Sequence, residues 1–294
     1  MQSPSEHALT SPARIGVLLL HGLTGMPSEM RPLKKALEAE GYQVAVPLLP
    51  GHGADASALL ASTWGDWLQG AKTALLALRE TCDVVFVGGL SMGSLLAAML
   101  SADPACGVSG LIMISPTLFY DGSSTPITRY LLPLVDWSPF LGRILSWKER
   151  PPFGLKDERL QKIIAKSIEA AKQGEGTNFG LFETHVGALR QLKLLARVLC
   201  QQAAQVQCAA LILHSMEDTI ATPKNAFEMY QLLGSAQKQV CLLQGGDHVL
   251  TVDLCKGQVN QAVLKFIEET VLSLAANSNH MQCLPRASEQ VQAG

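Results

Sequence analysis

Short apolar runs alternate along this chain with longer segments in which apolar residues recur at helical spacing. The apolar runs are rich in valine, isoleucine and leucine and occupy residues 15–20, 44–46, 84–87, 111–114, 211–213 and 240–243. Such an alternation is typical of parallel strands joined by crossover helices. It predicts an α/β fold built on a doubly wound, mostly parallel sheet. Residues 84–87 are apolar throughout and are expected to form a central strand, buried on both faces.

Three segments have the pattern of helices that cover this sheet. The first has Pro32 in its first turn, carries leucines on one face and stops before Gly41. The second covers residues 64–78, where tryptophan, leucine and alanine recur every three or four residues. The third, residues 258–274, is expected to be the last helix of the fold.

The regular alternation stops over residues 115–206. A connection of that length is too long for a compact domain, so we expect an inserted, mainly helical cap. Residues 157–172 have helical spacing, and a second helical stripe consists of Phe182, His185, Leu189, Leu192, Ala196 and Leu199. The predicted core is therefore residues 1–114 and 207–274. Residues 275–294 are polar and are expected to form a loose C-terminal tail.

The composition argues against several classes of protein. Of 294 residues, 48% are hydrophobic and 16% charged, and the net charge of −2 gives no long-range attraction for nucleic acid. The seven cysteines are odd in number and show no CxxC spacing, so we expect free thiols and no metal. No apolar stretch approaches the ~20 residues of a transmembrane helix. The first residues lack the basic and apolar segments of a secretory signal, which favours a cytoplasmic protein.

The pentapeptide Gly89-Leu90-Ser91-Met92-Gly93 is the strongest sign of chemistry in the chain. It is a G-x-S-x-G sequence between an expected strand and a helical run. This is the context of a nucleophile elbow, where a serine lies on a tight strand-to-helix turn and small neighbours let the chains pass closely. Ser91 is therefore the candidate nucleophile, at a helix N-terminus that favours a developing oxyanion. The alternative is that Ser91 only caps the helix.

A serine hydroxyl needs a base that takes its proton, and the base needs a carboxylate. His248 follows the strand expected at residues 240–243 and is the candidate base, with His214 as the alternative. The acidic pair Glu217 and Asp218 follows the preceding strand. Because adjacent side chains point in different directions, only one of the two is expected to face the histidine. The order serine, acid, histidine is the order of α/β-hydrolases.

The loop after the first expected strand, residues 21–25, is expected to supply half of an oxyanion hole. The candidate donors are the backbone N–H groups of Leu23 and of Met92, which directly follows the candidate nucleophile. The glycines of the loop matter only because they permit the turn. His21 and His52, each beside a glycine, are expected to be structural hydrogen-bonding residues.

Several short motifs of the chain occur together. They are Leu18-Leu19-Leu20-His21-Gly22, Pro50-Gly51-His52-Gly53, the Gly89–Gly93 pentapeptide, Asp218-Thr219-Ile220 and His248. This set resembles the carboxylesterase and monoacylglycerol-lipase branch of the α/β-hydrolases, over residues 15–274 except the cap. The resemblance implies Ser91 as nucleophile, His248 as base and Asp218 as acid, because the family's acid is followed two residues later by an inward-packing aliphatic residue. It also implies hydrolysis of acyl esters or monoacylglycerols without a cofactor.

The predicted cap departs from the compact cap expected in that branch, both in length and over residues 128–141. Since the cap shapes the acyl and alcohol pockets of this fold, Leu131, Leu134 and Phe140 are the candidate substrate-binding residues. Their apolar segment could also contact a membrane surface, although no basic cluster accompanies it. The expected partner is a small acyl ester or a lipid-like molecule.

Other functions use the same three residue types. A triad also serves thioester hydrolysis, amide hydrolysis and acyl transfer, and only the resemblance favours carboxylic-ester hydrolysis among them. Dehalogenases and epoxide hydrolases of this fold carry aspartate at the elbow, which Ser91 argues against. A non-catalytic binding protein that keeps the pocket is the alternative of a different class.

Overall fold

A computed structural model describes residues 13–53, 55–125, 145–148, 150–172 and 183–282. Its centre is a sheet of six parallel strands in the order β2-β1-β3-β4-β7-β8. The strands are β1 (Ile15–Leu20), β2 (Gln43–Ala45), β3 (Val84–Leu90), β4 (Gly110–Ile114), β7 (Ala209–Ser215) and β8 (Lys238–Leu243). Because β1 lies between β2 and β3, the strand order reverses there, and the predicted doubly wound parallel sheet is confirmed.

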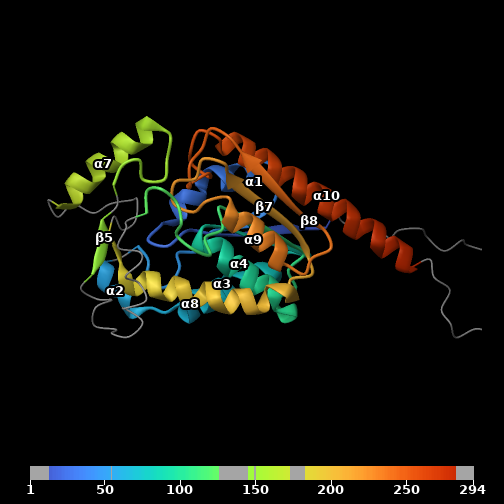
Figure 1. Cartoon of the computed structure of the whole chain (residues 1–294). Coiled ribbons are helices and arrows are strands. Elements are labelled where there is room, and N and C mark those ends of the chain that lie inside the picture. Colours follow the sequence, from blue (N-terminus) through green and yellow to red (C-terminus); the bar gives the residue numbers. More distant parts are fainter. Residues whose placement is uncertain (1–12, 54, 126–144, 149, 173–182, 283–294) are drawn as a thin grey trace, which may run out of the picture.

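Helices cover both faces of the sheet (Figure 1). One face packs against α1 (Arg31–Ala39) and α10 (Lys256–Gln282), and the other against α3 (Trp64–Arg79), α4 (Met92–Ala102), α8 (Val186–Gln202) and α9 (Lys224–Leu232). The short helices α2 (Ala56–Ala61), η1 (Pro27–Met30), η2 (Pro104–Cys106) and η4 (Ala203–Gln205) lie in the connections. Successive residues of β1 alternate between the two hydrophobic clusters, as the period of a strand requires.

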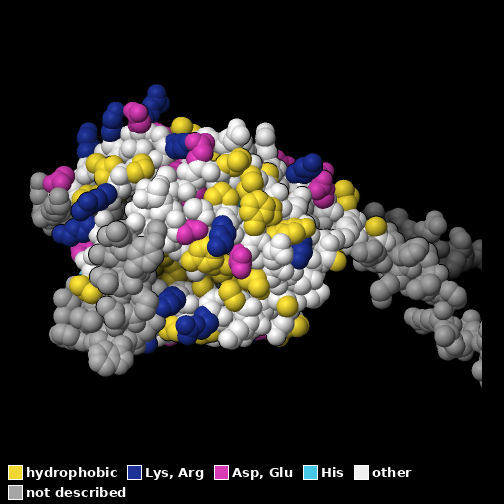
Figure 2. Space-filling model, in the orientation of Figure 1, with side chains coloured by type: hydrophobic (Ala, Val, Ile, Leu, Met, Phe, Trp, Pro, Cys, Tyr) yellow, Lys and Arg dark blue, Asp and Glu magenta, His cyan; other side chains and the backbone are white. Residues whose placement is uncertain are grey.

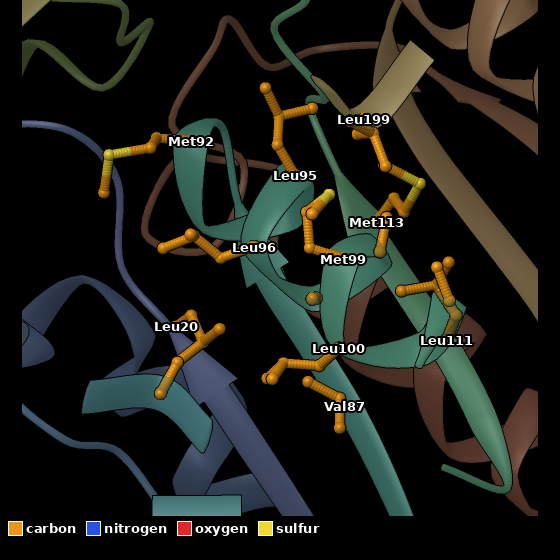
Figure 3. Packing of buried hydrophobic residues seen from close by; sticks show 14 of the residues in the cluster. Leu20, Val87, Met92, Leu95, Leu96, Met99, Leu100, Leu111, Met113 and Leu199 are labelled. Carbon is orange, nitrogen blue, oxygen red and sulfur yellow. The ribbon is translucent and has the colours of Figure 1, made fainter. Parts of the chain in front are cut away.

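The helix α4 directly follows the central strand β3 and is buried on all sides except at Ser101. It is apolar around its whole circumference, which is typical of a helix inside a core. Figure 3 shows its side chains between the sheet and α8. The labelled residues are Leu20, Val87, Leu111 and Met113 from the strands, Met92, Leu95, Leu96, Met99 and Leu100 from the beginning and middle of α4, and Leu199 from α8. The turn that precedes α4 is therefore held by a rigid support.

The segment between β4 and β7 contains elements that the pattern of the sequence predicts only in part. The predicted helix at residues 157–172 is observed as α7 (Glu158–Lys172), whereas the antiparallel pair β5 (Ser146–Lys148) and β6 (Glu183–His185) is not predicted. His185 ends β6 and pairs with Ser146, so its assignment to the helical stripe is wrong. The helix begins only at Val186. The predicted Phe182 lies outside the described residues, as do Leu131, Leu134 and Phe140.

The helix α8 belongs to the predicted cap by its position in the sequence but not by its packing. Its buried residues Leu192, Leu195 and Leu199 contribute to the same hydrophobic cluster as α3 and α4. The residues from Val186 onward are therefore part of the packing of the core. The spacing of the stripe could not distinguish a cap helix from a core helix, because both bury one apolar face.

The last helix is longer than the sequence pattern predicts. The helix α10 continues through Gln282, so the expected start of a loose tail at residue 275 is wrong within the described residues. Residues 275 and 276 are alanines, and neither glycine nor proline occurs up to Gln282. A polar composition alone does not end a helix that lacks such a residue.

Charged side chains of both signs are interspersed over the face shown in Figure 2. This distribution agrees with the small net charge of −2. In the described part of the chain no helix combines the length and the apolar character needed to cross a membrane.

Candidate active site

Ser91 lies on the turn between β3 and α4 with a strained backbone, at φ 53° and ψ −117°. The two glycines of the pentapeptide are required by packing. A Cβ atom on Gly89 would stand 2.7 Å from the amide nitrogen of Ser94, and one on Gly93 would stand 2.6 Å from the carbonyl oxygen of His21. A side chain on Gly89 would push α4 away from β3, and one on Gly93 would push α4 away from β1. The G-x-S-x-G pattern thus lets the turn approach its neighbours closely enough to present the serine.

The structure brings Ser91, Asp218 and His248 together. They lie in the loops that follow the carboxyl ends of β3, β7 and β8. His248 Nε2 lies 3.0 Å from Ser91 Oγ, and His248 Nδ1 lies 2.7 Å from Asp218 Oδ2. Ser91, Asp218 and His248 are 7%, 6% and 5% exposed, so little water competes for these hydrogen bonds. Such a relay can transfer the hydroxyl proton of the serine to the imidazole.

Asp218 is fixed by its own loop. Its Oδ1 accepts hydrogen bonds from the amides of Ile220 and Ala221, both at 2.8 Å. Burial opposes its ionisation, but His248 and His214 offset that effect and hold the pKa of this carboxyl well below its usual range. The carboxylate is therefore charged throughout the physiological pH range.

Glu217, the other acid of the pair, points away from His248. Its carboxylate pairs with Lys156 and accepts a hydrogen bond from the amide of Gly245 at 3.1 Å. Its side chain is 47% exposed, whereas that of Asp218 is fully buried. The geometry therefore places only Asp218 against the histidine.

The imidazole of His248 is buried in a charged environment. Burial alone would lower its pKa, but the neighbouring Asp218 carboxylate, with smaller contributions from Asp247 and Glu29, raises the pKa above its usual value. The backbone of this loop is also fixed, because the amides of His248 and Val249 both donate to the carbonyl oxygen of Gly154, at 3.0 and 2.9 Å. The position of the base therefore depends on the segment that precedes α7.

A single buried carboxylate connects that segment to the histidine loop. Asp253 accepts hydrogen bonds from the amides of Lys156, Asp157 and Asp247, at distances from 2.7 to 3.0 Å. It also accepts one from the amide of Leu254 at 2.8 Å. Four main-chain donors from two segments thus meet on one side chain, which has no exposed surface.

The expected oxyanion donors come from two loops, one after β1 and one after β3. The Leu23 amide is in the loop after β1, where Thr24 adopts φ 62° and the amide of Gly25 donates to the carbonyl oxygen of Gly22. The Met92 amide is the first of α4. Within the described residues neither N–H has an acceptor in the protein. Both are therefore free to bind an oxygen of a substrate.

The side chain of His21, with His52 beside it, forms hydrogen bonds between two loops around the site. The amide of Leu49 donates to His21 Nε2 at 3.2 Å, and His21 Nδ1 lies 2.9 Å from the carbonyl oxygen of Gly22. Burial, together with the neighbouring His52, lowers the pKa of His21 to about 3. His21 is thus a neutral hydrogen-bonding residue that connects the loop after β1 to the loop after β2.

Sequence reasoning missed two polar residues beside the nucleophile. Thr117 Oγ1 lies 3.0 Å from Ser91 Oγ and donates to the carbonyl oxygen of Ser115 at 3.1 Å. Glu29, in η1, lines the same cavity as Ser91. Thr117 follows the end of β4, so the rule that polar residues after strands meet at one edge of the sheet could have found it. No local pattern marks Glu29.

A cavity of about 900 Å³ opens beside Ser91 and His248. Its apolar wall comes from the segment before α7, from α7, α8 and the two loops of the base and the acid, and consists of Phe153, Leu155, Leu160, Ile164, Leu189, Ile220, Val249 and Val252. Polar groups of the lining near the start of the fold are Thr24 in the loop after β1 and Ser28 and Glu29 in η1. Lys148 and Arg150 also line it. Leu192, in the same helix as Leu189, does not line the cavity and is buried in the core.

The described residues hold no cluster of histidine, cysteine, aspartate and glutamate that could bind a metal ion. The described cysteines, at positions 82, 106, 200, 208, 241 and 255, are free thiols.

Comparisons with known proteins found a matching family and several relatives. The family described as "Serine aminopeptidase, S33" matches residues 11–254. A thermostable monoacylglycerol lipase of Bacillus sp. (strain H-257) is 28% identical over 255 residues, which cover 86% of this chain and 90% of that protein. A carboxylesterase of Bacillus subtilis is 21% identical over 254 residues, covering 86% and 92%.

Solved structures of lipolytic enzymes share the fold. A structure reported with the metagenome-derived lipolytic enzymes LipS and LipT has a TM-score of 0.72 and 30% identity, and the match covers 87% of this chain and 94% of that chain. The monoacylglycerol lipase of Paleococcus ferrophilus has a TM-score of 0.71 at 19% identity, with the same coverage of 87% and 94%.

Proposed function

The chain belongs to the family described as serine aminopeptidase S33 and is a serine hydrolase of the α/β-hydrolase fold, and on this premise we propose that it hydrolyses carboxylic esters of the monoacylglycerol type. Ser91, His248 and Asp218 act as its catalytic triad. The observation that carries the proposal is the continuous relay from Asp218 through His248 to Ser91, whose hydroxyl faces a cavity with a long apolar wall.

The reaction proceeds in two halves. Ser91 Oγ attacks the ester carbonyl carbon while His248 Nε2 takes the hydroxyl proton, and Asp218 stabilises the imidazolium that forms. The tetrahedral intermediate collapses, the carbon–oxygen bond to the alcohol breaks, and His248 returns the proton to the departing alcohol oxygen. A water molecule then repeats these steps on the acyl-enzyme and releases the carboxylic acid, which restores Ser91.

The amides of Leu23 and Met92 serve as the oxyanion hole in this proposal. Both are main-chain donors without a protein acceptor in the described part of the chain. Donors that are fixed before the reaction stabilise the charge of the tetrahedral intermediate without reorganisation, and one such donor contributes about 3 kcal/mol in measured cases.

The apolar wall of the cavity supports an acyl chain as the bound group. The names of two relatives, a monoacylglycerol lipase and a carboxylesterase, point to the same class of substrate. We infer that β5, β6 and α7 belong to a cap over the sheet, because Trp147, Thr184 and Leu160 from these elements line the cavity that also contains Ser91. The cap thus encloses the acyl chain in this proposal.

Labelling with a fluorophosphonate probe tests the triad. The wild-type protein should react covalently, and Ser91→Ala should lose both labelling and ester turnover with an unchanged melting temperature. Ser101→Ala is the matched control, since the Ser101 hydroxyl donates to the carbonyl oxygen of Ala97 in the same helix and does not line the cavity. A wild-type protein that is not labelled would support a non-catalytic binding protein instead.

A substrate panel separates the chemistries that one triad can perform. We expect monoacylglycerols and p-nitrophenyl esters to be hydrolysed with a higher kcat/KM than acyl-coenzyme A thioesters or aminoacyl p-nitroanilides. A preference for the thioesters would identify a thioesterase. Formation of a new ester in the presence of an added alcohol, at the expense of free acid, would identify an acyltransferase.

A further inference from the structure

Glu29 holds its carboxyl group in the cavity beside the candidate nucleophile. Its Oε2 accepts a hydrogen bond from the amide of Gly22 at 3.2 Å. A methyl group on Gly22 would lie 3.6 Å from Ser91 Cβ and 3.7 Å from Glu29 Oε2, so the two side chains flank the same glycine. Glu29 lines the cavity together with Ser91 and His248.

The loop leaves a place for this carboxyl group. A Cβ atom on Gly25 would lie 2.6 Å from Glu29 Cδ and still closer to both carboxyl oxygens. Glycine at position 25 therefore lets the side chain of Glu29 fold over the loop that carries the Leu23 amide. The carboxyl group is a built part of the cavity wall, and no salt bridge among the described residues neutralises it.

The surroundings of Glu29 change the pKa of its carboxyl group. Although Glu29 faces the cavity, protein surrounds it, and burial raises its pKa to about 7 against the opposing effects of the Gly22 amide and His248. Near neutral pH it is present in both protonation states. It can therefore accept a hydrogen bond from a hydroxyl group and, when protonated, donate one.

The lining of the cavity contains groups suited to both halves of an ester. Leu160, Ile164 and Leu189 are apolar and suit an acyl chain. Glu29 and Thr24 are polar residues of the same lining. The departing alcohol oxygen must lie beside His248 to receive its proton, and Glu29 is close enough to His248 for the two groups to shift each other's pKa.

We propose that Glu29 determines the specificity for the alcohol part of the substrate, by hydrogen bonding to the hydroxyl groups of an uncharged polyol such as glycerol. This inference rests on the proposed ester hydrolysis and names the residue that selects the leaving group. An ammonium group is the other partner that a carboxyl group attracts, but Lys148 and Arg150 line the same cavity and oppose a cationic substrate.

A series of three octanoate esters tests the proposal, because only the alcohol differs among them. Ethyl, hydroxyethyl and glyceryl octanoate carry no, one and two free hydroxyl groups. The wild-type kcat/KM should rise along this series. In Glu29→Leu the ratio of glyceryl to ethyl ester should fall about tenfold, because a hydrogen bond to a carboxyl group is lost only with the polyol.

Two further variants separate specificity from structure. Glu29→Gln keeps an acceptor and gains a donor in nearly the same shape, so it should restore most of the ratio. Glu38→Gln is the control, because Glu38 is an exposed residue of α1 whose carboxylate lies 3.6 Å from Lys34. It should leave the ratio within twofold of the wild type. Melting temperatures check that each variant is folded.

Different results would contradict the role proposed for Glu29 and the proposed ester hydrolysis. If Glu29→Leu lowers all three esters by the same factor, Glu29 only supports the oxyanion loop and the specificity proposal is wrong. Hydrolysis of an aminoacyl p-nitroanilide that disappears in Glu29→Leu would overturn it in favour of a bound ammonium group.

If the wild-type protein hydrolyses none of the esters, the proposed function itself fails. In that case protection against fluorophosphonate labelling by glycerol, compared between wild type and Glu29→Leu, still decides whether Glu29 binds a polyol, and equal protection overturns the proposal.

Discussion

His214 and Asp218 contact each other behind the relay: His214 Nε2 lies 3.2 Å from Asp218 Oδ2, the same oxygen that faces His248 Nδ1. The same nitrogen lies 2.7 Å from the carbonyl oxygen of Ala221, whose amide donates to Asp218 Oδ1. His214 has no exposed surface. It does not reach Ser91 through any contact of the described residues, so it is placed to orient the acid rather than to act as the base.

Replacing His214 should therefore reduce the rate without changing substrate binding. His214→Leu removes one of the groups that orient Asp218, and we expect kcat to fall about tenfold with KM within twofold. His214→Gln keeps a side-chain N–H and should lose less. Steady-state kinetics on one ester measure both constants. Equal losses in the two variants, or a loss confined to KM, would show that His214 has only a structural role.

The acid can be identified by comparing two neighbouring residues. Asp218→Asn should lower kcat by roughly four orders of magnitude, as the loss of the corresponding carboxylate does in serine proteases, because His248 loses its orienting charge. Glu217→Gln should change kcat less than twofold, since Glu217 contacts Lys156 and Gly245 at the surface. The opposite ranking would assign the acid to Glu217.

The pH dependence follows from the charge next to His248. Only a neutral imidazole can take the serine proton, and Asp218 raises the pKa of His248 above the ordinary 6.5 by stabilising the charged form. The value of kcat/KM should therefore fall with decreasing pH, with a midpoint above 6.5. A profile from pH 5 to 9 measures it. A midpoint well below 6.5 would mean that burial, not Asp218, dominates the titration of His248.

The apolar wall can be tested with two adjacent isoleucines of α7. Ile164 lines the cavity, whereas Ile163 is 46% exposed to solvent. Each methylene that a pocket buries contributes about 0.8 kcal/mol, so Ile164→Ser should reduce kcat/KM for decanoate esters several-fold more than for acetate esters. Ile163→Ser should affect neither. The same loss for both chain lengths would place the acyl chain elsewhere in the cavity.

The close packing around Gly93 leads us to expect that a larger residue there destabilises the fold. A methyl group on Gly93 would meet the backbone of β1 and its following loop, 2.6 Å from the carbonyl oxygen of His21, and backbone cannot move aside cheaply. Gly93→Ala should lower the free energy of unfolding by about 1–3 kcal/mol. Gly257→Ala in α10 is the control, because a methyl group added to Gly257 would have no atom within 4 Å. It should be neutral or stabilising by up to about 1 kcal/mol in chemical denaturation.

The sheet could be predicted from sequence because each of its strands has a local signature. The run at residues 84–87 is apolar on both faces, and β3 is indeed central in the sheet. The pair β5 and β6 could not be predicted in this way. Each strand is three residues long, and 34 residues separate Lys148 from its partner Glu183, so their pairing depends on tertiary structure alone.

The residues of the candidate site could also be predicted from sequence only in part. Ser91 and His248 follow strands and lie in motifs with a mechanical reason, so the sequence was sufficient to place them. Glu29 lies in a short 3-10 helix without a motif, and its position in the cavity depends on the space that Gly25 leaves in the folded chain. Information of this kind exists only after folding.

The carboxylate of Asp253 joins the segment before α7, which lines the cavity, to the loop that carries His248. Its hydrogen bonds, together with the two that the Gly154 carbonyl oxygen accepts, connect the segment before α7 to the His248 loop. If an acyl chain binds along this wall as proposed, one that is too long and displaces this segment is expected to shift the imidazole away from Ser91 as well. Such a substrate would be bound but turned over slowly, so the alignment of the relay itself would limit the chain length.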